Sequence, residues 1–197
     1  MHRRKIKFAL TRNVKQPKRE EGSAGIDFFV PFFSKDFYKS LYEYNPDLNM
    51  FKWDVDLFKS ELSDKNNDDV EFDSAKEKYI YLCEGEDIVI PSGIICQMEK
   101  SDDPNMDVAL IAHNKSGIAT KLKLVKGAQV VDYSYRGEIL MHLLNESGDM
   151  VKIEYGQKIL QFVETPIFTS KIDIVKVSDI NLNTNRGAGW AGSTGIK

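Results

Sequence analysis

The hydrophobic residues of this chain fall mostly into short runs separated by turn-forming residues. Each run is rich in Val, Ile, Leu and Tyr and is bounded by Gly, Pro, Asn, Ser or Asp, which is typical of β-strands joined by turns. The runs are AGIDFFVPFF, KYIYLCEGEDIVIPSGIICQME (interpreted as two strands around a turn at Gly85, then a PSG turn and a third strand), MDVALIAHN, LKLVKGAQVVD, GEILMHLLNES, DMVKIEYGQKILQFVETPI and SKIDIVKV. Many short strands at near-regular spacing predict an all-β sandwich, jelly roll or barrel.

Residues 33–78 interrupt this pattern. Apolar residues recur there at helical spacing in two stretches, one with Phe37, Leu41 and Tyr44 and one with Phe58 and Leu62. The later SDKNNDDVEFD has the polarity of an exposed loop. We therefore expect one domain over 1–197 that carries an insertion at 33–78 with one or two short amphipathic helices. Its aromatic residues are expected to pack on the β body, and the alternative is a docking surface for a protein partner.

Composition narrows the class of protein. The 197 residues contain 42% hydrophobic and 29% charged residues, as in a soluble globular domain. A net charge of -3 argues against a surface built for nucleic acid, although the first dozen residues are basic. No apolar run approaches the roughly 18 residues that span a membrane. Cys83 and Cys96 lack metal-ligand spacing, so we expect reduced thiols in a cytoplasmic protein, or in the host-cell cytoplasm if the protein is viral.

Five short stretches carry residues suited to binding a polyphosphate. Their candidates are Asp27 in GSAGID, Lys115, Ser116 and Gly117 in NKSGIAT, Asp132 and Tyr135 in VVDYSYRGE, Lys158 and Gln161 in GQKILQF, and Arg186, Trp190, Gly192, Ser193 and Thr194 in RGAGWAGSTG. A lysine, a hydroxyl and a backbone N–H in one turn can cradle a phosphate oxygen. Each stretch alone is weak, since a Ser-Gly pair in a turn is usually structural.

In order and spacing, however, the five stretches resemble the motifs of the trimeric dUTPase family. They read AGIDFFV, NKSGIA, GAQVVDYSYRGE, GQKILQF and RGAGWAGSTG. The resemblance implies a jelly-roll-like β-barrel subunit and a homotrimer with shared active sites. It implies that one chain supplies the first, second and fourth motifs, a second supplies the third, and a third lends its C-terminal arm, here 183–197.

The resemblance also implies Mg²⁺-dependent hydrolysis of dUTP to dUMP and pyrophosphate. Asp132 matches the general base that activates water for attack on the α-phosphorus. Asp27 would act on Mg²⁺ through bound water. The family's phosphate-binding positions fall on Lys115, Ser116, Gly117, Lys158, Gln161, Arg186, Gly192, Ser193 and Thr194.

Recognition of uracil is assigned by the resemblance to the hairpin from Lys126 to Leu140, with Gln129 and Leu140 among the positions facing the base. Tyr135 matches the tyrosine beneath the deoxyribose, where a ring leaves no room for a 2′-hydroxyl. The family's stacking phenylalanine falls on Ala191, and Trp190 beside it is the expected replacement.

Several other positions depart from the family pattern. Lys115 and Lys158 replace arginines, which keeps the charge and loses the bidentate fork. Lys126 and Gln129 replace an asparagine and a glycine near the base.

Two other functions remain open from the sequence. One is a regulatory or partner-binding protein on a dUTPase scaffold, using the insertion. The other is a relative of the dCTP deaminases, which share the fold but lack this glycine-rich tail.

Overall fold

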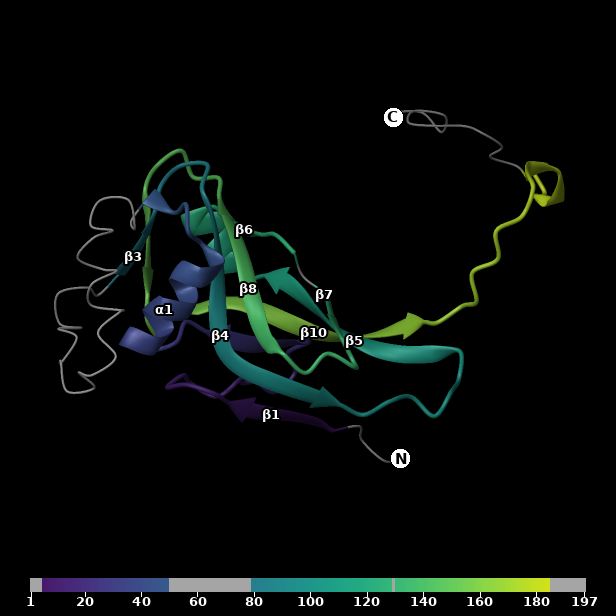
Figure 1. The fold of residues 1–197 in the computed structure, drawn as a ribbon, viewed down its shortest axis with the longest axis horizontal. Coiled ribbons are helices and arrows are strands. Elements are labelled where there is room, and N and C mark those ends of the chain that lie inside the picture. The colour runs from purple at the N-terminus through teal and green to yellow at the C-terminus, as the bar shows by residue number, and fades with distance from the viewer. Residues whose placement is uncertain (1–4, 50–78, 129, 185–197) are drawn as a thin grey trace.

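The computed structural model describes residues 5–49, 79–128 and 130–184 (Figure 1). Its strands are β1 Ile6–Leu10, β2 Gly25–Phe29, β3 Tyr79–Leu82, β4 Asp87–Met98, β5 Met106–Asn114, β6 Leu124–Lys126, β7 Val130–Asp132, β8 Glu138–Asn145, β9 Val151–Glu154 and β10 Lys158–Phe168. The helical elements are α1 Lys35–Tyr44, a π-helical turn η1 Ile118–Leu122 and a 3₁₀ turn η2 Val177–Asp179. No helix in the described ranges is long and apolar enough to cross a membrane.

The strands form two four-stranded antiparallel sheets and one small pair. One sheet has the order β1-β4-β8-β6, the other has the order β2-β10-β5-β7, and β3 pairs with β9. Among the described strands no ladder joins the two large sheets, so they form an open sandwich and not a closed barrel. The predicted all-β, jelly-roll-like fold is confirmed.

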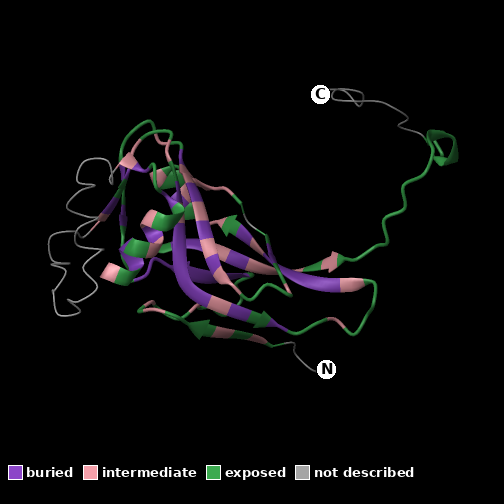
Figure 2. Ribbon diagram, viewed as in Figure 1, coloured by how far each residue is buried: buried purple, intermediate pink, exposed green. Residues whose placement is uncertain are grey.

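One hydrophobic core lies between the two sheets (Figure 2). Strand β8 illustrates how this core forms. Half-buried and buried residues alternate along it, and Ile139, Met141 and Leu143 are fully buried. Successive side chains of a strand point to opposite faces, so this alternation places one face of β8 on the core. In contrast, β2 is buried at every position.

The predicted turn at PSG is wrong, because β4 runs through it as a single strand. The register to β8 shifts between Pro91 and Ile95, which marks a bulge, and Gly93 there has a φ of +72°. Before the bulge β4 pairs with β8, and from Ile94 onward it also pairs with β1. A bulge bends a strand without ending it, so β4 serves two partners.

The first predicted helix of the insertion is confirmed as α1, and it belongs to the core. Phe37, Tyr38 and Leu41 are completely buried. Just beyond α1, the side chain of Asn45 accepts a hydrogen bond from the Val89 N–H (2.7 Å) and donates one to the Val89 carbonyl (2.9 Å). The helix end therefore satisfies backbone groups of β4. The second predicted helix and the acidic loop lie outside the described residues, so a partner surface in the insertion stays a prediction.

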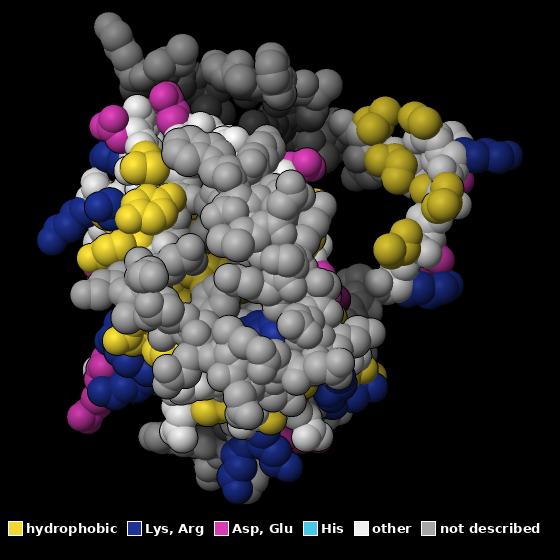
Figure 3. Space-filling view, turned by 60° about the vertical axis from the view of Figure 1, so that its left-hand side comes forward, with side chains coloured by type: hydrophobic (Ala, Val, Ile, Leu, Met, Phe, Trp, Pro, Cys, Tyr) yellow, Lys and Arg dark blue, Asp and Glu magenta, His cyan; other side chains and the backbone are white. Residues whose placement is uncertain are grey.

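The predicted strand at SKIDIVKV is wrong for the single chain. After β10 the chain leaves the body as a long extension without regular strand pairing (Figure 1). Ile172 and Ile174 are 89% and 98% exposed. Figure 3 shows hydrophobic side chains gathered along this projecting segment. The sequence has strand character, but a strand forms only where a second strand supplies hydrogen-bond partners.

Candidate active site

Three charged side chains from the first, second and fourth sequence motifs meet at one end of the second sheet. Asp27 of β2 contacts the Nζ atoms of Lys115, which follows β5, and Lys158, which begins β10. The Lys158 Nζ lies 3.0 Å from Asp27 Oδ2, and Lys115 binds Oδ1. The order β2-β10-β5 brings these positions together, although 88 residues separate Asp27 from Lys115.

The environment of Asp27 favours the ionised carboxylate. Burial alone would raise the pKa of Asp27, but the hydrogen bonds and charges of Lys115 and Lys158 outweigh burial and lower that pKa. The hydrogen bond and charge of Asp27 in turn raise the pKa of Lys158. The side chains of Lys115 and Lys158 remain 25% and 42% exposed, so an incoming anion can reach part of each side chain.

Gln161 of β10 lies beside this charged group. Its Cα is paired with Asp27 on one side and with His113 on the other. The Gln161 Nε2 donates to the Asn114 carbonyl at 3.0 Å, and the side chain lies directly over Gly25. A Cβ at Gly25 would collide with the Gln161 amide. Gly25 thus provides the space in which Gln161 is held.

Ser116 and Gly117 follow Lys115 at the start of η1. The φ and ψ of Gly117 are −63° and −35°, which any residue can adopt, and no atom lies within 4 Å of where a Cβ would be. Within the described structure, neither strain nor crowding requires glycine here. The open space is therefore available to a ligand or to a neighbouring chain.

The third motif builds a separate pocket of about 210 Å³. Asp132 stands exposed at the end of β7 and lines this pocket together with Tyr135 and Leu140; their roles toward a substrate stay predictions. The remaining lining residues are Ala128, Val130, Val131, Ile139 and Phe162. The pocket thus combines apolar walls with one carboxylate.

The turn after Asp132 fixes the orientation of Tyr135. The Tyr135 hydroxyl donates to the Glu138 carbonyl at 3.0 Å, and the phenol ring packs on Gly137, where a Cβ would collide with it. Arg136 donates to the carbonyls of Tyr133 (2.6 Å) and Tyr135 (2.8 Å). These contacts close the turn without using the carboxylate of Asp132.

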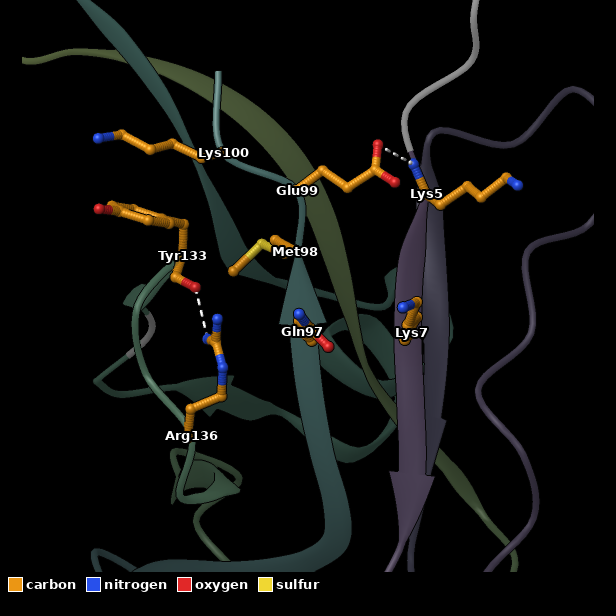
Figure 4. Close-up of a pocket in the computed structure, with 8 residues that line it drawn as sticks. All are labelled: Lys5, Lys7, Gln97, Met98, Glu99, Lys100, Tyr133 and Arg136. Atoms are coloured by element: carbon orange, nitrogen blue, oxygen red, sulfur yellow. Dashed lines mark hydrogen bonds between the residues drawn. The ribbon is translucent and has the colours of Figure 1, made fainter. Parts of the chain in front are cut away.

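Behind this turn lies a second hollow, of about 310 Å³ (Figure 4). Its lining residues are Lys5, Lys7, Gln97, Met98, Glu99, Lys100, Tyr133 and Arg136. Glu99 accepts a hydrogen bond from the Lys5 N–H at 3.2 Å, and Arg136 is held by Tyr133 as described above. This hollow backs the third-motif turn and contains none of the predicted site residues.

Within one chain the two groups of predicted residues are far apart. Asp27 is paired with Gln161 of β10, which is paired in turn with His113 of β5. Asp132 is paired with Ala109 of β5. Four residues along β5 and three strand spacings across the sheet place the backbone positions of the two residues roughly 20 Å apart. The structure therefore brings Asp27, Lys115, Lys158 and Gln161 together, and separately Asp132, Tyr135 and Leu140.

Six other predicted site residues lie outside the described residues: Gln129, Arg186, Trp190, Gly192, Ser193 and Thr194. Sequence reasoning also missed Asn114, although it stands in the quoted NKSGIA motif. The Asn114 Oδ1 accepts the Lys126 N–H at 2.8 Å, and its carbonyl accepts from Gln161, so this residue of the second motif contacts the fourth motif and the residue just before the third. The feature of the sequence that could have identified Asn114 is its position as a polar residue at the end of a buried strand.

The described residues would leave a magnesium ion to be held mainly by a bound nucleotide. They contain no group of three or more His, Cys, Asp or Glu side chains that could hold a metal. Asp27 is the predicted carboxylate, and both of its oxygens contact ammonium groups. Magnesium commonly keeps several waters and binds through phosphates, so a single water-mediated carboxylate is a consistent arrangement.

Comparisons with known proteins test the resemblance found in the sequence. A family model described as dUTPase matches residues 61–195. A Desulfitobacterium hafniense protein named deoxyuridine 5'-triphosphate nucleotidohydrolase is 30% identical over 129 residues, which cover 64% of this chain and 80% of that protein. A protein of the same name from Yarrowia lipolytica is 39% identical over 82 residues, covering 42% of this chain and about half, 52%, of that protein.

Among solved structures, a Staphylococcus bacteriophage 80alpha dUTPase with dUpNHpp superposes with a TM-score of 0.61. The match covers 98% of this chain and 99% of the phage chain at 17% identity, so it supports the fold alone. The family model, in contrast, spans more than half of the chain and includes four of the five motifs. On this sequence evidence, and with a fold that agrees, the chain belongs to the dUTPase family.

Proposed function

We propose that this protein hydrolyses dUTP to dUMP and pyrophosphate. The observation that carries the proposal is the pocket of the third motif, where an exposed carboxylate, Asp132, stands beside apolar walls and an oriented tyrosine, Tyr135. Membership of the dUTPase family supports the reaction, and the exposure of Asp132 beside the pocket supports its proposed role.

Asp132 is the proposed general base. A water molecule hydrogen-bonded to its carboxylate attacks the α-phosphorus and gives a proton to Asp132, while the bond from the α-phosphorus to the bridging oxygen breaks and pyrophosphate leaves. Because the turn after Asp132 is closed by Arg136 and Tyr135, the carboxylate is free to hold that water. A positioned base of this kind typically increases the reaction rate by roughly 10²–10⁴-fold.

Lys115 and Lys158 are proposed to bind the phosphates. In the chain alone both contact the single carboxylate of Asp27, so their ammonium groups are already in place before a nucleotide arrives. Ser116, the backbone of Gly117 and the amide of Gln161 complete this side of the site. Lysine offers point charges without the bidentate geometry of arginine, so alignment depends on how firmly Asp27 holds the two side chains.

Magnesium is the proposed cofactor, with Asp27 as its water-mediated protein contact. When bound, Mg²⁺ neutralises phosphate charge and favours departure of pyrophosphate. The residues of this chain have a different task, which is to align the α-phosphorus with the water on Asp132.

The third-motif pocket is proposed to select uracil and deoxyribose. Backbone groups of the hairpin from Lys126 to Leu140 would pair with the uracil edge. Cytosine presents the opposite pattern of donor and acceptor and would leave buried groups unpaired, which is strongly disfavoured. Tyr135 would press on the sugar and exclude a 2′-hydroxyl.

A homotrimer is the proposed assembly, because the candidate site residues of one chain form two separate groups. The two groups of site residues are roughly 20 Å apart by the sheet spacings. The exposed segment with Ile172 and Ile174 needs an apolar partner, which a second copy would provide. In such a trimer the arm 183–197 would close over a neighbouring site, with Arg186, Ser193 and Thr194 on the γ-phosphate and Trp190 over the base.

A turnover assay with purified protein tests the proposal directly. dUTP and dCTP are supplied separately with Mg²⁺, and pyrophosphate and ammonia are measured independently. Pyrophosphate released from dUTP without ammonia from dCTP is the expected result. Ammonia from dCTP would instead support the deaminase alternative, and no product from either nucleotide would support a binding or regulatory role.

A further inference from the structure

His142 of β8 has no place in the reaction described above, yet it supports the loop that enters the uracil pocket. This loop connects β6 to β7, and Ala128 of the loop lines the pocket together with Val130, the first residue of β7. The Ala128 N–H donates to the His142 Nδ1 at 2.9 Å. The Gly127 N–H donates to the His142 carbonyl at 2.9 Å. Two consecutive amides of the loop are thus held by one residue.

Gly127 also packs directly against the imidazole. A Cβ at this position would collide with the ring, and its three nearest atoms would all belong to His142. The φ of Gly127 is not in the left-handed region, since the positive-φ glycines are Gly22, Gly85, Gly93, Gly148 and Gly156. Glycine is therefore needed here for the close approach of the ring and not for backbone freedom.

The hydrogen bonds define which nitrogen of His142 carries the proton. A backbone N–H only donates, so the Nδ1 that faces Ala128 must be the unprotonated acceptor. The proton of the neutral ring is then on Nε2, which lies 2.8 Å from Asp87 Oδ2 on β4. Asp87 selects the tautomer that leaves Nδ1 free to hold the loop.

We propose that His142 is a positioning residue for base recognition. The inference rests on the proposed function, in which backbone groups of the 126–140 hairpin pair with the uracil edge. Backbone groups select a base only if the loop is held in place to a fraction of an ångström, and side chains beneath the loop must provide this support. The His142 ring, oriented by Asp87 and fitted to Gly127, provides it here.

Three variants at this position separate the hydrogen bond from the volume of the ring. In His142→Asn the side-chain oxygen takes the place of Nδ1 and accepts the Ala128 N–H. In His142→Gln the polar group reaches the place of Nε2 and leaves the Ala128 N–H unpaired. His142→Ala removes both contacts. We expect the Ala and Gln variants to raise the KM for dUTP about 10-fold, and the Asn variant to stay within about 2-fold of wild type.

We expect the variants to weaken nucleotide binding and to leave the chemical step nearly unchanged. Because Asp132 and the phosphate side are untouched, kcat should change less than about 3-fold in all three variants. The preference for dUTP over dCTP in kcat/KM should fall about 10-fold in the Ala and Gln variants. Binding of a non-hydrolysable imido analogue of dUTP should weaken in parallel with KM, since it reports affinity without turnover.

A double-mutant cycle with Gly127→Ala tests the packing. The added methyl group should raise KM when His142 is present and have a smaller effect in the His142→Ala protein, where the ring has gone. The protonation of the ring can be read from ¹⁵N-histidine spectra. The His142 signal is assigned as the one that disappears in His142→Asn, and in the wild type it should show an unprotonated Nδ1.

The outcomes distinguish this inference from the function it rests on. If the wild type does not release pyrophosphate from dUTP, the proposed function fails. If the wild type is active but the Gln and Asn variants share the same KM and the same base preference, His142 does not position the loop, and the inference is overturned. Should the Ala variant not fold, the comparison of Asn with Gln still decides.

Discussion

The contact between Asp27 and its two lysines leads to a prediction about stability. Asp27→Asn keeps the size of the side chain and removes its charge, so Lys115 would lose its carboxylate partner and Lys158 would keep only Glu20, at 3.6 Å. The Asp27 side chain is only 9% exposed, so water cannot fully replace the lost partner. We therefore expect the variant to be folded and less stable than wild type.

The size of the effect follows from the contacts. A hydrogen bond to a charged group contributes roughly 1.5–3 kcal/mol, and Asp27 accepts one from each lysine. The lysines are 25% and 42% exposed and regain hydration when the carboxylate is removed, which reduces the sum. We expect a loss of about 2–3 kcal/mol in the free energy of unfolding, which for a domain of this size lowers Tm by roughly 4–12 °C.

The effect should depend on pH in a defined direction. The pKa of Asp27 is lowered from its ordinary value of 3.8, so its contribution is complete well above that value and is lost as the pH falls through the lower pKa of the folded state. The difference between wild type and Asp27→Asn should be constant near neutral pH and should shrink only below about pH 4.

Thermal unfolding followed by near-ultraviolet circular dichroism measures this difference. The protomer concentration must be the same for both proteins, because assembly itself raises Tm. Glu20→Gln is the matched control, since Glu20 also approaches Lys158 (3.6 Å) but is half exposed, and no change in Tm is expected. Equal Tm values for Asp27→Asn and wild type at pH 7 would refute the reasoning, as would a difference that grows in acid.

Three further predictions concern the reaction, the insertion and the tail. Asp132→Asn should retain the assembly and nucleotide binding while kcat falls at least ~10²-fold, and near-normal turnover would contradict the proposed base. Replacing 50–78 with a Gly-Ser linker should leave turnover within a few-fold of wild type, because the closure entropy of a loop changes little with its length. Leu41→Ala in α1 should instead lower the free energy of unfolding by about 2–5 kcal/mol, measured by chemical denaturation. Trp190→Ala should weaken binding of a non-hydrolysable dUTP analogue about 5- to 150-fold, the equivalent of 1–3 kcal/mol of stacking, and Trp190→Phe should recover much of it. Wild-type affinity in the Ala variant would mean that the arm closes without stacking.

The elements of this protein could largely be predicted from local sequence patterns. The alternation along β8 and the helical spacing of Phe37 and Leu41 each predict an element that the structure contains. Such patterns work because the repeat of side-chain direction in a strand or helix is a local property. The five motifs likewise identify the family, since their order and spacing are carried by the chain itself.

The tertiary structure decided what the patterns leave open. The strand-like segment with Ile172 and Ile174 is not a strand in the single chain, because no described strand offers it hydrogen bonds. The PSG sequence became a bulge and not a turn, because β4 has partners on both sides of it.

Contacts within the site also required the fold. No local pattern indicates that Asp27 binds two lysines, that Gly127 is needed beneath the ring of His142, or that Asp132 lies roughly 20 Å from Asp27 across the sheet. These relations join residues that are remote in sequence, and the order of strands sets their distances. The sequence by itself determined most of the strands, the first helix and the family, whereas only the packed sheets decided which side chains meet, because contact depends on topology and not on spacing along the chain.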